Sequence, residues 1–219
     1  MKPSNRLIDK TLIITTIICL VPLLFSWVVY DQLPEQVPIH YNAMGEPDGY
    51  ATKAFGAFGM PLILALLNVI IQIAVKTDPK RDTSSKLYYI TKWIIPILTL
   101  FMVPLTLLHA LERPLHIENL VPLAVSILLL VVGNYLPKIK QNYTIGIKLP
   151  WTLGDEVNWK KTHRLAGWIW TLCSLLFILA IILDIYVAWI FFTGLAVMVL
   201  TPLVYSFILA QKQHQNDSV

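Results

Sequence analysis

The chain has 219 residues, of which 56% are hydrophobic and only 14% are charged. In soluble domains about a quarter of the residues are charged, so this composition excludes an ordinary soluble protein. The formal net charge of +4 does not indicate direct nucleic-acid binding, because the cations of a membrane protein serve to orient it. We therefore expect an all-α integral membrane protein that contacts lipid.

The apolar residues gather into six runs of about twenty, the length that crosses roughly 30 Å of hydrocarbon. The predicted spans cover residues 11–30, 55–75, 90–110, 120–136, 165–183 and 185–210. The first run follows Lys2, Arg6 and Lys10, as a signal peptide would, but it is long and lacks a small-residue cleavage site. We therefore expect it to be retained as the first helix of a six-helix transmembrane bundle.

The distribution of Lys and Arg predicts that both termini lie in the cytoplasm. With the N-terminus inside, the outer segments contain only Lys53 and Arg113, and the other cations outside the spans fall on the inner side. Lys92 lies at the inner end of the third span, where its long side chain is expected to reach the interface. The expected location is a bacterial plasma membrane, crossed several times.

Two long loops, 31–54 on the expected outer side and 138–164 on the expected inner side, are where we expect function. In the outer loop, prolines favour extended backbone, and residues 37–41 are predicted to form a short strand at the membrane surface. Residues 42–45 are predicted to form a turn. The sequence Glu-Pro-Asp-Gly at 46–49 predicts a type I turn, with proline second and glycine fourth.

Three side chains of the outer loop, His40, Glu46 and Asp48, could suggest a metal site. Their spacing matches no recognised ligand pattern, so we predict neither a metal nor another cofactor. The alternatives are a histidine that hydrogen-bonds within the loop beside solvated acids, and a surface that meets an extracellular ligand.

The inner loop begins after Pro137, which ends the fourth span. Apolar and polar residues alternate over 143–149, which predicts a strand with one apolar face. Thr152 and Asp155 have the spacing of a capping box, which predicts that a helix begins at Thr152 and runs straight into the fifth span.

On this predicted helix, Trp159 and His163 are four residues apart and share one face. Gly167 would allow a close neighbour. The loop is expected either to anchor the bundle, with tryptophans at the interface and lysines facing anionic lipid, or to dock a cytoplasmic protein.

The chain contains no metalloprotease, serine-hydrolase or phosphate-loop motif, and we predict no enzymatic activity. The polar residues expected within spans are few: Lys92, His109, Asn134 and Asp184. A small-solute or ion transporter remains the alternative function, although no ionisable group is expected near the midplane and no repeated halves are evident.

Two long motifs resemble a known family. The inner-loop strings GNYLPKIKQNYTIGIKLPWTL and WKKTHRLAGW resemble the signature of the SdpI family of bacterial immunity proteins. The outer string LPEQVPIHYNAMGEPDGY resembles the small domain of unknown function that forms the N-terminal part of many members. The resemblance implies two membrane modules, 1–110 with the outer loop and 111–219 with the inner loop.

The resemblance also implies a two-sided function. A family member protects a toxin-producing cell from its own secreted peptide toxin, senses that toxin, and holds a cytoplasmic winged-helix repressor at the membrane. A protein that only lowers the membrane's sensitivity to peptide attack, without a repressor, is a further possibility. The outer motif, on the toxin side, comprises Leu33, Pro34, Pro38, His40, Gly45, Asp48 and Gly49. The inner motif, on the repressor side, comprises Asn134, Pro137, Asn142, Gly146, Pro150, Trp151, Thr152, Trp159, Thr162, His163 and Gly167.

Overall fold

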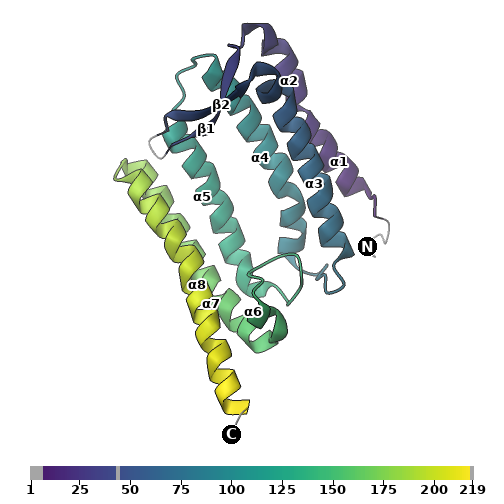
Figure 1. Cartoon of the computed structure of the whole chain (residues 1–219), viewed down its shortest axis with the longest axis vertical. Coiled ribbons are helices and arrows are strands. Elements are labelled where there is room, and N and C mark those ends of the chain that lie inside the picture. The colour runs from purple at the N-terminus through teal and green to yellow at the C-terminus, as the bar shows by residue number, and fades with distance from the viewer. Residues whose placement is uncertain (1–6, 43–44, 218–219) are drawn as a thin grey trace. The chain divides into compact units, whose positions relative to one another are not determined.

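The computed structural model describes residues 7–42 and 45–217, which are mostly helical (Figure 1). Among them are six helices long and apolar enough to cross a membrane: Lys10–Gln32, Phe55–Thr77, Lys86–Ala110, Ile117–Lys138, Glu156–Leu183 and Val187–Lys212. They match the six predicted runs to within a few residues, except that the fifth begins earlier. Its first turns are polar, so hydropathy alone underestimates the length of this helix.

The described residues fall into two compact units. One contains the residues up to Thr77 together with Tyr89–Glu118, and the other contains Asp78–Tyr88 together with the residues from Asn119 onwards. The helix α4 (Lys86–Ala110) begins in the second unit and continues into the first.

The first unit contains most of the first three spans. Its first span consists of α1 (Lys10–Leu20) and α2 (Pro22–Val29), which are separated at Val21 because Pro22 has no amide hydrogen to donate. Its second span consists of a single π-helical turn and α3 (Met60–Thr77), which packs against α1. Two prolines lie inside α4.

A β-hairpin connects the first two spans (Figure 1). Its antiparallel strands are β1 (Gln36–Tyr41) and β2 (Pro47–Thr52). The predicted strand is therefore confirmed, but the predicted type I turn at 46–49 is wrong, because the segment from Pro47 onwards pairs with β1. Of the predicted turn at 42–45, residues 43 and 44 lie outside the described residues. Gly45 donates its amide to the carbonyl of Asn42 at 3.0 Å, which is consistent with a tight connection.

An apolar cluster holds the hairpin on the helices of its unit. Val37, which is fully buried, points from β1 into this cluster. The cluster consists of Val29, Leu33, Val37, Ala57, Val103 and Leu107. Gly56 permits this contact, since a Cβ at that position would lie 3.0 Å from Val37. The hairpin is thus a packed element and not a free loop.

The second unit contains most of the last three spans. Its elements are most of α5 (Ile117–Tyr135), a 3-10 turn at Leu136–Lys138, α6 (Pro150–Gly154), α7 (Glu156–Leu183) and α8 (Val187–Asp217). The last two helices reverse direction through Asp184, whose φ of 52° ends α7 in a left-handed conformation. They pack closely, because a Cβ on Gly194 would lie 2.2 Å from the Phe177 ring.

The inner-loop predictions are partly wrong. Residues 143–149 form irregular backbone and no strand, because side chains hydrogen-bond to their backbone groups in place of a partner strand. The long helix does not begin at Thr152: a short helix, α6, starts at Pro150, and Asp155 caps α7 by accepting the amides of Val157 and Asn158. The prediction that this helix continues into the fifth span is confirmed.

The polarity of the spans is the reverse of that of a soluble protein. Large apolar side chains such as Trp27, Ile182 and Trp189 are more than two-thirds exposed. Polar side chains are buried among the helices: Thr15, Ser26, Asn68, Gln72, Thr99, Ser126, Ser174 and Ser206. Helices with apolar outer faces and polar inner contacts are expected where lipid is the solvent.

Candidate functional sites

The exposed end of the hairpin carries the polar residues of the outer motif. His40 Nδ1 and Asp48 Oδ1 are 2.5 Å apart, and both side chains are substantially exposed. Gly49 lies opposite His40 in the strand register, and a Cβ there would be 2.9 Å from that of His40. The glycine therefore allows the imidazole to reach the carboxylate of Asp48. This arrangement agrees with the hypothesis of hydrogen bonding within the loop.

The other residues of the outer motif support the hairpin. Leu33 and Pro38 are buried, whereas Pro34 is exposed. Gly45 has a φ of +80°, a conformation that costs side chains free energy, and a Cβ at this position would lie 2.6 Å from Glu118. The motif thus combines a structural base with one exposed polar pair.

A second aromatic contact joins the hairpin to α4. The rings of Tyr41 and His109 stack with their centroids 5.3 Å apart, and the Tyr41 hydroxyl lies 3.2 Å from His109 Nδ1. Burial, helped by the nearby Tyr50, raises the pKa of Tyr41 to about 12, so its hydroxyl stays neutral. Sequence reasoning placed His109 in the third span and assigned it no role, since nothing local links it to Tyr41.

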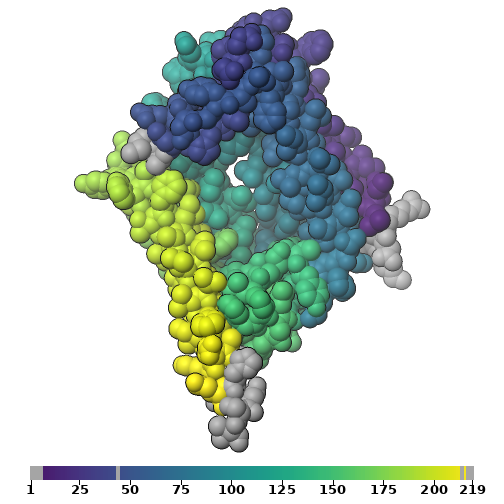
Figure 2. All heavy atoms as spheres, in the orientation of Figure 1, coloured from purple at the N-terminus to yellow at the C-terminus, as the bar shows by residue number. Residues whose placement is uncertain are grey.

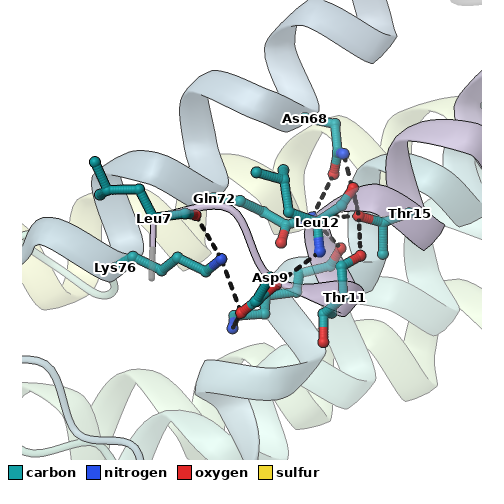
Figure 3. A network of polar contacts seen from close by, with 9 residues as sticks. Leu7, Asp9, Thr11, Leu12, Thr15, Asn68, Gln72 and Lys76 are labelled. Atoms are coloured by element: carbon teal, nitrogen blue, oxygen red, sulfur yellow. Dashed lines mark hydrogen bonds and ion pairs between the residues drawn. The ribbon is translucent and has the colours of Figure 1, made fainter. Parts of the chain in front are cut away.

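A buried polar network, drawn in Figure 3, lies where α1 begins and α3 ends, away from the hairpin. The ammonium group of Lys76 donates to the carboxylate of Asp9 at 2.8 Å and to the carbonyl of Leu7 at 2.8 Å. Lys92 Nζ lies 3.9 Å from the same carboxylate. Burial would raise the pKa of Asp9, but the hydrogen bonds from Lys76 and Leu12 and the two lysine charges lower it below its usual value. Lys92 is therefore buried beside Asp9, which directly precedes the first span, and its reach to the membrane interface stays a prediction.

Amide and hydroxyl groups extend this network between α1 and α3 (Figure 3). Gln72 donates to the hydroxyl of Thr15 and to the side-chain carbonyl of Asn68, and Asn68 donates to the hydroxyls of Thr15 and Thr16. Sequence reasoning missed this network. The available signal was the spacing of Asn68, Gln72 and Lys76, which are four residues apart and therefore share one face of an apolar helix.

In the second unit, the inner motif folds around a buried histidine. The ring of His163 stacks on Trp159, with centroids 4.0 Å apart, as the predicted shared face requires. Its Nδ1 donates to the carbonyl of Trp159 at 2.8 Å, and its Nε2 accepts the amide of Ile147 at 2.9 Å. Gly146 lies against both rings. His163 is fully buried, so it holds the loop in place and does not present itself to a partner.

Asn142 and Asp78 organise the first half of the loop. The Asn142 side chain accepts the amides of Thr144 and Ile145 and donates to the carbonyls of Lys140 and Ile145. Asp78, which follows the second span, accepts the amide of Tyr143 at 2.8 Å and the hydroxyl of Thr144 at 2.7 Å. Sequence reasoning missed Asp78, because its partners lie more than sixty residues away.

The second half of the loop is attached to α8 (Figure 2). Trp151 donates its indole N–H to the Ser206 hydroxyl at 2.9 Å, and Asn158 donates to the Ser206 carbonyl at 2.9 Å. Thr162 donates in turn to the side chain of Asn158. Thr152, two residues after Pro150 at the start of α6, bonds to the backbone of Leu149 and Ile147.

Close backbone contact joins the end of the fourth span to α7. A Cβ on Gly167 would lie 2.4 Å from Pro137 and 2.9 Å from the carbonyl of Gly133, so the predicted close neighbour is confirmed. Asn134 is exposed beside this contact, at the rim of a groove in the second unit.

These arrangements are suited to binding. Within residues 7–42 and 45–217, no group of three or more His, Cys, Asp and Glu residues could hold a metal ion. The exposed polar chemistry of the two motifs is a histidine–carboxylate pair on the hairpin, and cations with one aromatic side chain, Tyr143, on the 138–164 segment.

Six apolar helices with two folded connecting motifs define a multi-pass membrane protein. Residues 138–206 match the SdpI/YfhL protein family, and residues 17–65 match a domain of unknown function, DUF1648. The chain is 30% identical over 214 residues to the immunity protein SdpI of Bacillus subtilis (strain 168). The aligned region covers 94% of this chain and 97% of that protein. The chain therefore belongs to the SdpI/YfhL family, and the resemblance is confirmed. No solved structure matches it.

Proposed function

We propose that this protein is a membrane immunity protein that protects the cell against a secreted peptide toxin. The observation that carries the proposal is its full-length similarity to an immunity protein, which includes both folded motifs. The geometry supports it because the hairpin presents an exposed polar pair, His40 and Asp48, on a rigid apolar base. A preformed exposed surface binds a ligand without the cost of ordering a loop.

The proposed orientation places the hairpin outside and both termini in the cytoplasm, as the Lys and Arg distribution favours. It is tested with single cysteines introduced at Glu35 and Lys161 after replacement of Cys19 and Cys173 by alanine. A membrane-impermeant maleimide should label Glu35→Cys in intact cells and Lys161→Cys only after permeabilisation. The opposite labelling pattern would show that the orientation is inverted.

Protection is tested by expressing the protein in a toxin-sensitive bacterium and measuring survival against a secreted peptide toxin of the type that the family counteracts. Wild-type protein should raise survival, and His40→Ala and Asp48→Asn should reduce that gain. Glu35→Gln is the matched control, because it removes an exposed acid that pairs with Lys53 in the same loop. If the wild type gives no protection at good expression, the proposed immunity function is contradicted for that toxin. If all three variants behave alike, the assignment of the toxin side to this pair is wrong.

We further propose that the 138–164 segment recruits a winged-helix repressor and that protection and recruitment belong to separate modules, 1–110 and 111–219. Trp159 and His163 are buried among residues of the segment, so replacing either with alanine should disorder it. The measurement is the membrane-bound fraction of a co-expressed fluorescent repressor of this type. Recruitment should fall while protection remains, whereas joint loss of both at equal abundance would contradict separate modules.

A further inference from the structure

The second unit contains a groove where the end of the fourth span meets the start of α7. Its volume is about 630 Å³, within the range of small-molecule sites. Four of its lining residues are cations: Lys138, Lys140, Lys160 and Arg164. We propose that this groove binds the headgroup of an anionic phospholipid. This inference requires membrane insertion but does not depend on the proposed immunity function.

The charges of the groove are only partly compensated. Burial would raise the pKa of Asp82, but hydrogen bonds from Ser84 and the charge of Lys140 lower it, so Lys140 has an acidic neighbour. Lys160 pairs with Glu156 at 2.9 Å, one turn along α7. Lys138 lies over the ring of Tyr135, 4.8 Å from its centroid. Within the described residues, no carboxylate oxygen lies within 4.0 Å of the cationic nitrogens of Lys138, Lys140 or Arg164. A phosphate group would supply the missing negative charge, and arginine can bind it through two hydrogen bonds.

The chemistry of one face of α7 changes in the order that a phospholipid requires. Lys160, Arg164 and Trp168 are spaced by four residues, so they follow one another along this face. Trp168 lines the groove and is 63% exposed, and tryptophan prefers the interface between headgroups and hydrocarbon. At 1.5 Å per residue, the tryptophan lies about 6 Å beyond the arginine along the helix axis.

Beyond Trp168, the same face continues as an exposed leucine stripe. Leu172, Leu175 and Leu179 follow at spacings of four, three and four residues, and each is at least half exposed. The stripe extends about 16 Å past the tryptophan, comparable to one leaflet of a bilayer's hydrocarbon. An acyl chain can lie along it while the headgroup occupies the groove. An acidic protein segment would match the cations but not a stripe that continues into the hydrocarbon, so the lipid is the better occupant.

The test uses the purified full chain in nanodiscs of phosphatidylcholine that contain increasing fractions of brominated phosphatidylglycerol. Bromine quenches tryptophan fluorescence at short range, and the difference between wild type and Trp168→Phe isolates the signal of Trp168. Wild-type Trp168 should be quenched at a low fraction of brominated phosphatidylglycerol and much less by brominated phosphatidylcholine. Lys140→Gln combined with Arg164→Gln should raise the half-quenching fraction roughly 25-fold.

The matched control is Lys148→Gln combined with Lys161→Gln, which removes the same charge from exposed positions outside the groove. It should change the half-quenching fraction less than twofold, and circular dichroism should show equal folding of both double variants. Equal effects of the two double variants would reduce the binding to a nonspecific charge effect and overturn the proposal. Equal quenching by the two lipids, or displacement by polyglutamate without lipid selectivity, would also overturn it.

Discussion

The substitution Gly146→Ala tests whether the buried histidine organises the inner motif. Gly146 has a φ of +120°, where a side chain is strained by roughly 1–3 kcal/mol. A Cβ would also lie 2.5 Å from His163 Nε2 and 3.1 Å from the Trp159 ring. Neither ring can move easily, because they stack on each other and the Nδ1 of His163 is bonded to the Trp159 carbonyl.

The magnitude follows from what must break. Moving the imidazole removes the acceptor of the Ile147 amide, and an unsatisfied buried donor costs roughly 1–3 kcal/mol. Together with the backbone strain, we expect Gly146→Ala to lower the free energy of unfolding by roughly 2–6 kcal/mol. Hydrogen exchange of the Ile147 amide should become faster, which a loss of stability confined to other regions of the protein would not cause.

The free energy of unfolding is measured by titrating the purified protein from a mild detergent into sodium dodecyl sulfate. Gly154→Ala is the control, because a Cβ at that position meets no atom within 4 Å and the position lies in the same segment. It should change the free energy by less than about 0.5 kcal/mol. If the two variants differ by less than that amount, the loop does not depend on the histidine contact.

Three further predictions concern other buried contacts. Asp9→Asn should cost about 3 kcal/mol at neutral pH, because two buried lysines lose their shared carboxylate. Since the folded protein lowers the pKa of Asp9, its contribution is complete above about pH 4 and is lost as the pH falls through the lowered pKa, so the thermal stabilities of wild type and variant should converge in acid. Gly167→Ala should cost about 1–3 kcal/mol by collision with Pro137, measured in the same detergent titration; no loss would show that this contact can relax freely. Asp78→Ala should cost roughly 2 kcal/mol and speed hydrogen exchange in the 143–144 segment, because two donors there lose their acceptor; unchanged exchange would contradict that role.

Local patterns predicted the regular elements correctly where a single physical requirement dominates. Crossing hydrocarbon requires a run of about twenty apolar residues, so the six runs were predictable from hydropathy. The strand over 37–41 and the shared face of Trp159 and His163 were predictable because strand and helix periods are fixed by backbone geometry. The spacing of four between Asn68, Gln72 and Lys76 in α3 is a periodic signal of the same kind.

Local patterns failed where a distant side chain satisfies the backbone. The alternation over 143–149 resembles a strand, but His163 and Asp78 bind its amides and leave it irregular. The sequence at 46–49 resembles a turn, but pairing with β1 makes it part of a strand. Hydrogen bonds to side chains of other elements outweighed local preference over 143–149, and backbone pairing with the neighbouring strand did so at 46–49.

The sequence by itself determined the six helices, the hairpin's first strand and the membership of the family, because these depend on composition, periodicity and long contiguous motifs. Only the tertiary structure decided which polar residues meet. It placed Asp9 beside Lys76 and Lys92, Tyr41 beside His109, and four cations around one groove. Those pairs are far apart in the chain, and the helices that bring them together pack through small residues and apolar contacts that impose no local signature.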